Sequence, residues 1–481
     1  MQGERIGDTW RYLALPFAAP PVGPLRWRPP APPACHDGVR FTTTYGPACP
    51  QLEDGVYSGD EDCLHLNIWT PAAAPADGAP RPVLFFIHGG GNVQGSASVG
   101  AAGAVLYDGQ RLAERFGVVV VVTQYRLGPL AWLVHPALAD AAGRSGNHGT
   151  RDQIAALDWT RRNIAAFGGD PDRVTLFGES AGGRNICTLI ASPPAAGLFH
   201  GAIIQSGGCV QPSPEQVAAV GLEIITAAGC ADAPDIETCM RALGARELLE
   251  ARPPIVEVAG RSDALQPYAD GEILLGQPED IIAAGQHNDV PIIIGANADE
   301  TSTSTPPIAT EAAYEAALRA TLGPLTDRVL ELYPASDYDS PQAAYIQVTT
   351  DAKFVCGARR AARAAAVGGQ SPVYLYHFTQ NLSRAPRLAP AGAYHGIELF
   401  FVWQQMDFAN YRATPQELAL AEAIGGYWTR FAADGTPGGL PPWPAYEAAT
   451  DEAIVFHGDG IEVISGIRAA KCDFWDALDP G

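Results

Sequence analysis

The sequence predicts an α/β protein built on one mostly parallel sheet that is covered by helices on both faces. Several short runs are apolar throughout, as strands buried on both faces are, and helical segments separate them. We find no internal repeat and no boundary linker. Because the 481 residues are 47% hydrophobic, the chain can bury a large core. We therefore expect a single domain over residues 1–481.

The expected helices and strands follow from the pattern of apolar residues and from the glycine and proline residues that separate them. The proline-rich stretch from Leu15 to Pro30 contains Phe17, Leu25 and Trp27, apolar anchors that predict an ordered coil around the core instead of a disordered linker. Helices are expected at 152–167 and 181–190, and Ala-rich helical insertions at 211–285 and 311–366. Buried strands are expected at 64–69, 82–87, 118–123, 174–177, 202–206, 291–295 and 373–378.

The central stretch, residues 174–183, has the pattern of a strand, a tight glycine turn and a helix, with Ser180 at the apex. Gly178 and Gly182 flank the serine where a side chain would collide with a neighbouring strand or helix. This turn places the hydroxyl at a helix N-terminus, which favours developing negative charge. Ser180 is therefore the candidate nucleophile, although the pattern alone fits an ordinary turn equally well.

A second glycine-rich turn follows the buried strand 82–87, in His88-Gly-Gly-Gly91. Its backbone N–H groups can turn toward the serine, as in an oxyanion hole, and this interpretation is favoured over a merely flexible loop. The expected donors are the N–H groups of Gly90, Gly91 and Ala181.

A nucleophilic serine needs a base and an acid that orients the base, in the chain order serine, acid, histidine. His395 lies in a glycine-flanked loop after a core strand, whereas His287 and His457 are weaker candidates. Glu300 follows the strand 291–295, and its neighbour Asp299 is an immediate rival. The residues alone leave the choice between these two acids open.

Charge and residue composition limit which binding partners and cofactors the protein can have. The net charge of −22 disfavours nucleic acid and anionic membrane surfaces, and no apolar run is long enough to span a membrane. No cysteine and histidine spacing is typical of zinc, and serine chemistry needs no metal or organic cofactor, so we expect none. The first residues lack the apolar segment of a signal peptide, so we expect that any such segment has been removed.

Seven motifs together resemble the type-B carboxylesterase family of α/β-hydrolases, over nearly the whole chain. The resemblance implies Ser180, Glu300 and His395 as a catalytic triad, with Glu179, Ser206 and Asp351 in supporting places and the helical insertions forming an active-site gorge. The motifs are Phe17-Ala-Ala-Pro-Pro-Val-Gly23, Glu61-Asp-Cys-Leu-His-Leu-Asn67, His88-Gly-Gly-Gly91, Tyr125-Arg-Leu-Gly128, Phe167-Gly-Gly-Asp-Pro171, Gly178-Glu-Ser-Ala-Gly182 and Gln205-Ser-Gly207.

The function that this resemblance implies is hydrolysis of a small or medium organic ester through an acyl-enzyme. An alternative is a specialised ester that carries a carboxylate, or an amide or lactone, because the same constellation serves all of them. A non-catalytic, cholinesterase-like binding module is disfavoured, since serine, acid, base and glycines are all present. The only expected partner is the ester substrate, and the chain is expected to be a monomer or a homodimer.

The cysteines are similar to those of exported family members, which implies the pairs Cys49–Cys63, Cys230–Cys239 and Cys356–Cys472. Three disulfides predict an oxidising compartment, so a secreted or periplasmic protein, with a cytoplasmic one as the alternative. Cys35, Cys187 and Cys209 are left over, and Cys187 is expected to be a buried apolar thiol.

Some residues depart from the family pattern. The loop between the first two cysteines is too short for the tryptophan platform of cholinesterases. Gln124 and Asn92 replace the usual asparagine and a common aromatic, respectively. Arg184 lies one helical turn after Ser180, where it would either bind a carboxylate on an acyl group or, as we favour, form an internal ion pair.

Overall fold

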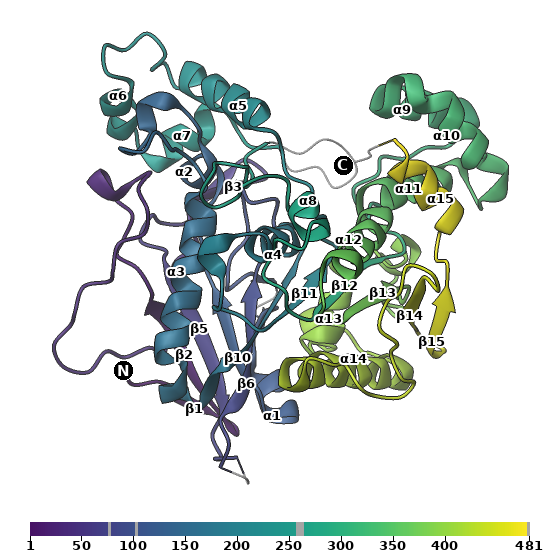
Figure 1. Ribbon diagram of the computed structural model, residues 1–481, viewed down its shortest axis with the longest axis horizontal. Helices are drawn as coiled ribbons and strands as arrows, with labels where there is room; N and C mark the ends of the chain where they lie inside the picture. The colour runs from purple at the N-terminus through teal and green to yellow at the C-terminus, as the bar shows by residue number, and fades with distance from the viewer. Residues whose placement is uncertain (76–77, 102–103, 256–263, 479–481) are drawn as a thin grey trace.

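A central sheet of eleven strands organises the chain in the order β1-β2-β5-β9-β6-β10-β11-β12-β13-β14-β15 (Figure 1). The computed structural model describes residues 1–75, 78–101, 104–255 and 264–478. From β9 to β14 all neighbouring strands are parallel, and the pairs at both edges are antiparallel. The strands are β1 (Glu4–Ile6), β2 (Thr9–Pro16), β5 (His65–Pro71), β6 (Arg81–Ile87), β9 (Val119–Thr123), β10 (Gly169–Glu179), β11 (Gly201–Gln205), β12 (Ile292–Asn297), β13 (Val373–Phe378), β14 (Glu452–His457) and β15 (Gly460–Ser465).

Helices cover both faces of this sheet because its strands are apolar on both sides. In β6, Val83 and Phe85 belong to one core cluster, whereas Leu84 and Phe86 belong to the other, as the two-residue period of a strand requires. The first cluster includes residues of α3 (His148–Asn163), α4 (Ala181–Ile190), α8 (Pro278–Ala283) and α12 (Cys356–Gly368). The second includes residues of α1 (Gln110–Phe116), α13 (Glu398–Val402) and α14 (Pro415–Asp434).

Helices of the two insertions, together with the C-terminal helix α15, form two groups, seen at the upper left and upper right of Figure 1. The right-hand group has a core of its own, in which Tyr314, Tyr333 and Trp475 are buried. The left-hand group is α5 (Pro214–Ala227), α6 (Ile236–Ala242) and α7 (Ala245–Ala251). The right-hand group is α9 (Glu311–Leu322), α10 (Thr326–Leu332), α11 (Pro341–Thr350) and α15 (Ala469–Asp476).

All seven expected strands are present, and the helix after Ser180 spans the expected residues. In the N-terminal coil, Phe17 and Trp27 are buried, as expected for anchors. The sequence reasoning missed β1, β2, β14 and β15, which lie at the two edges of the sheet. The side chains of β1, β2 and β15 are mostly exposed or half-buried, so their apolar pattern is weaker. In β14 the sequence reasoning overlooked a short buried run. Within the described residues, no helix has the length and apolar character needed to cross a membrane.

Four disulfides cross-link the structure. The pairs Cys49–Cys63, Cys230–Cys239 and Cys356–Cys472 are present as expected. The expectation of a free thiol at Cys187 is wrong, because this residue pairs with Cys209, while Cys35 is free and exposed. A Cβ atom at Gly207 would lie 2.7 Å from Gly183 Cα, so α4 and the segment after β11 approach closely enough to bring the two cysteines together.

Candidate active site

Ser180 occupies the sharp turn between β10, which ends at Glu179, and α4, which begins at Ala181. Its backbone has φ 57° and ψ −122°, a conformation that is strained for any residue except glycine. A Cβ atom at Gly178 would lie 2.7 Å from Ile87 O, and one at Gly182 would lie 2.0 Å from the same oxygen. The steric requirement for glycine on both sides of the serine is therefore confirmed.

His395 and Glu300 form a buried pair: His395 Nδ1 lies 2.6 Å from Glu300 Oε2. The other carboxylate oxygen of Glu300 accepts the Asn297 N–H at 2.7 Å, at the end of β12. Asp299, the rival acid, instead accepts the Ala393 N–H at 2.9 Å. Of the two candidate acids, only Glu300 contacts the histidine.

The second ring nitrogen of His395 contacts a different carboxylate. Nε2 lies 3.2 Å from Oε1 of Glu179, the residue before Ser180. No hydrogen bond joins the Ser180 hydroxyl to His395 within the described part of the chain. Contacts between a nucleophile and its base are often long in a free enzyme and shorten when substrate binds.

A third buried carboxylate, Glu398, completes a cluster around this histidine. It accepts hydrogen bonds from Asn297 Nδ2 at 2.6 Å and from Gln205 Nε2 at 3.1 Å. Burial, together with the charges of Glu179 and Glu300, raises the pKa of Glu398 to about 8. Sequence reasoning missed Glu398, for which the only signal was its position three residues after His395.

The cluster also shifts the pKa values of its other members. Burial by itself lowers the pKa of His395, but the charges of Glu179 and Glu300 and the hydrogen bond to Glu300 outweigh burial and raise it to about 9. Burial raises the pKa of Glu179 to about 7, against the opposing charge of His395. Near neutral pH, protons are therefore shared among Glu179, Glu398 and His395.

The loop His88–Gly91 approaches the serine closely. A Cβ atom at Gly89 would lie 3.1 Å from Ser180 Cβ, and one at Gly90 would lie 2.1 Å from Gln94 O. Among the residues that the structure describes, the backbone N–H groups of Gly90, Gly91 and Ala181 donate to no acceptor. Three free donors beside a serine are suited to an oxygen that gains negative charge.

Side-chain amides hold this loop in place. Asn92, whose backbone is left-handed with φ 64°, donates from Nδ2 to Gln266 Oε1 at 2.6 Å and accepts from Asn185 Nδ2 at 2.8 Å. Gln266 in turn donates from Nε2 to Gly91 O at 2.9 Å. The sequence carried no signal for Gln266, because it lies 175 residues after Gly91.

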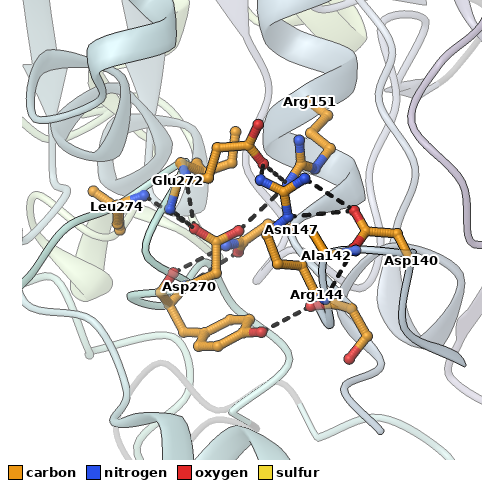
Figure 2. Close-up of polar contacts among 11 residues, drawn as sticks. Asp140, Ala142, Arg144, Asn147, Arg151, Asp270, Glu272 and Leu274 are labelled. Carbon is orange, nitrogen blue, oxygen red and sulfur yellow. Dashed lines mark hydrogen bonds and ion pairs between the residues drawn. The ribbon is translucent and has the colours of Figure 1, made fainter. Parts of the chain in front are cut away.

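The segment that follows Gln266 is anchored to the start of α3 by charged side chains (Figure 2). Arg151 contacts Glu272 at 2.7 Å and Asp270 at 3.5 Å. Arg144 contacts the same Glu272 at 2.5 Å, and Asn147 Nδ2 donates to Tyr268 O at 2.9 Å. These contacts fix the segment that carries Gln266 against the start of α3.

The other supporting residues behave differently from one another. Asp351 is fully buried in a π-helical turn and accepts from Tyr333 and Gln347 at 3.0 and 2.9 Å. The Ser206 hydroxyl is buried without a hydrogen-bond partner within the described residues, so no hydrogen bond links this expected supporting residue to Glu300. Among those residues, no group of acidic, cysteine and histidine side chains is arranged to hold a metal ion.

A mostly parallel sheet that carries a serine on a strand–turn–helix elbow, next to a histidine bonded to a buried glutamate, defines an α/β-hydrolase. The chain belongs to the carboxylesterase family, whose model matches residues 2–475. It is therefore an esterase.

Individual relatives agree with this assignment. The chain is 36% identical to the cocaine esterase of Homo sapiens, across 98% of this chain and 87% of that protein. It is 34% identical to the para-nitrobenzyl esterase of Bacillus subtilis (strain 168), across 95% of this chain and 93% of the relative. The solved structure of a PNB esterase, 33% identical, superposes with a TM-score of 0.84 over 98% of this chain and 97% of the other.

Proposed function

We propose that this esterase works through a covalent acyl-enzyme formed on Ser180. His395 takes the hydroxyl proton as Ser180 Oγ attacks the ester carbonyl, and it then gives that proton to the leaving alcohol. Water repeats the sequence on the acyl-enzyme, which releases the acid and restores the serine. The N–H groups of Gly90, Gly91 and Ala181 stabilise the negative oxygen in both steps.

The contact between His395 Nδ1 and Glu300 Oε2, 2.6 Å long, carries this proposal. A carboxylate at that distance keeps a proton on Nδ1, so the neutral ring has its lone pair on Nε2. Nε2 contacts Glu179, the residue before Ser180, and this contact supports Nε2 as the nitrogen that takes the Ser180 proton. The closeness of Gly89 to Ser180 Cβ supports the same arrangement.

The proposed substrate is a small or medium organic ester. The names of the relatives, a cocaine esterase and a para-nitrobenzyl esterase, support an ester with a bulky organic part. Amides and lactones are the competing class, since pocket shape and not the triad separates them. The four disulfides support a secreted or periplasmic location.

The test compares p-nitrophenol release from short and medium acyl esters by the wild type, Ser180→Ala and Ser58→Ala, a control at an exposed strand residue. We expect Ser180→Ala to lose several orders of magnitude in kcat and Ser58→Ala to match the wild type. Labelling of Ser180 by a small phosphonylating reagent, located by peptide mass spectrometry, identifies the nucleophile directly. A fully active Ser180→Ala variant would overturn the proposal.

A further inference from the structure

Arg184, one helical turn after the proposed nucleophile, has no negatively charged partner among the described residues. The Arg184 N–H donates to Ser180 O at 3.0 Å, so the two residues are one helical turn apart. Residues four apart lie on the same face of a helix, separated by about 6 Å along its axis. Because helical side chains lean toward the N-terminus, the Arg184 side chain leans toward the end of α4 that carries Ser180.

The expected internal ion pair of Arg184 is not found. Within the described residues, its guanidinium forms no ion pair, hydrogen bond or ring contact, although the side chain is half-buried. Elsewhere the chain pairs its buried arginines: Arg126 Nη2 lies 2.6 Å from Asp152 Oδ1, and Arg359 Nη2 lies 2.8 Å from Asp451 Oδ2. Burial without an opposing charge lowers the pKa of Arg184.

The position of the Arg184 cation in α4 adds to the free-energy cost of burying it. Arg184 lies in the first turn of α4, where the helix dipole favours anions and disfavours cations. A half-buried, unpaired cation at the positive end of a helix destabilises the free protein. This arrangement does not stabilise the free protein, so it does not suit a purely structural residue. It suits a residue whose counter-charge is supplied by a bound anion.

We infer that Arg184 determines specificity by binding a free carboxylate on the ester substrate. A guanidinium matches a carboxylate with two parallel hydrogen bonds. Because Arg184 lies one helical turn from Ser180, about 6 Å along the axis, we place that carboxylate a few carbons from the carbonyl that Ser180 attacks. The preferred substrates are then half-esters of short dicarboxylic acids, or esters of short hydroxy acids. This inference rests on the proposed role of Ser180.

The test uses two matched substrate pairs, followed by acid release in a pH-stat. Monoethyl succinate and ethyl butyrate differ by a carboxylate on the acyl part, and 3-acetoxypropionate and propyl acetate differ by one on the alcohol part. The variants are Arg184→Met, which removes the charge, and Arg184→Lys, which keeps it but loses the paired donors. Arg161→Met, at an exposed arginine of α3, is the matched control.

We expect the preference in kcat/KM for the charged member of one pair to fall about 10- to 100-fold in Arg184→Met. This preference falls less in Arg184→Lys and not at all in Arg161→Met. The substrate pair whose preference falls shows whether the acyl part or the alcohol part of the ester carries the carboxylate. Neutral esters should be hydrolysed by Arg184→Met as by the wild type. An unchanged preference in both pairs overturns the inference while the esterase mechanism stands, whereas a wild type that hydrolyses no ester overturns both.

A measurement on the wild type alone covers the case in which Arg184→Met does not fold. Succinamate and butyramide, which differ by one carboxylate, are compared as competitive inhibitors of ethyl butyrate hydrolysis. We expect succinamate to bind about 10- to 100-fold more tightly, and the difference to shrink as salt is added. Equal inhibition by the two compounds overturns the inference.

Discussion

Glu179 Oε1 lies 3.2 Å from His395 Nε2, on the opposite side of the imidazole ring from Glu300. One histidine is thus held between two carboxylates, and their charges raise its pKa to about 9 against the effect of burial. A general base must be neutral to take a proton. We therefore expect Glu179, the residue next to the proposed nucleophile, to contribute to the pH range in which the enzyme works.

Replacing Glu179 by Gln should move the acidic limb of the kcat/KM profile to lower pH. The substitution removes a negative charge that favours the imidazolium, so the pKa of His395 falls and the neutral base forms at lower pH. Glu300 and Glu398 remain, so the shift is partial. The measurement is kcat/KM for a neutral ester from pH 5 to 10, with Glu53→Gln, at an exposed strand residue, as control. An unmoved limb would show that another group controls the profile.

Substitution of the two adjacent acids separates their roles. Glu300→Gln should lower kcat by about 10³- to 10⁴-fold, because an amide no longer holds the Nδ1 proton of the working tautomer. Asp299→Asn should stay within about tenfold of the wild type, since an amide oxygen can still accept the Ala393 N–H. Steady-state kcat, corrected for active sites by phosphonate titration, checks both. A larger loss in Asp299→Asn would contradict the assignment of Glu300.

Gln266→Leu tests whether the amide cluster positions the glycine loop. The change removes the contacts to Asn92 and Gly91 at 2.6 and 2.9 Å and keeps side-chain volume. We expect kcat to fall about 10- to 100-fold with little change in KM, because N–H donors that are displaced from the oxyanion stabilise the transition state less. Gln286→Leu, at an exposed site, is the control. A change confined to KM would mean that Gln266 contacts the substrate instead.

The Cys187–Cys209 disulfide should stabilise the fold. Closing a loop with a sequence separation of 22 residues contributes about 3 kcal/mol to the free energy of unfolding in the chain-entropy model. We expect the double variant Cys187→Ala, Cys209→Ala to unfold at lower denaturant concentration, and Cys35→Ala, at the free cysteine, to leave the midpoint unchanged. Non-reducing peptide mapping checks the pairing, and a free Cys187 in the oxidised wild type would contradict it.

The sequence predicted the central elements because their signals are local. A strand buried on both faces must be apolar at every position, as in β6 and β9. A side chain at Gly178 or Gly182 collides with the Ile87 carbonyl, so the elbow was visible as a pattern. The outer strands β2 and β15 were missed because many of their side chains are exposed or half-buried, which leaves a weaker apolar pattern, whereas the four-residue buried run of β14 was overlooked.

What the sequence by itself determined is the set of central strands and the glycine-flanked turn at Ser180, since each follows from neighbouring residues, and the family motifs predicted the chain order of serine, acid and histidine. Only the tertiary structure decided the pairing of Cys187 with Cys209, the contact of Glu398 with Asn297 and the absence of an ion pair at Arg184 within the described chain. Each of these depends on segments far apart in the sequence, which no local pattern records. Their proximity is set by how the whole chain packs around the sheet.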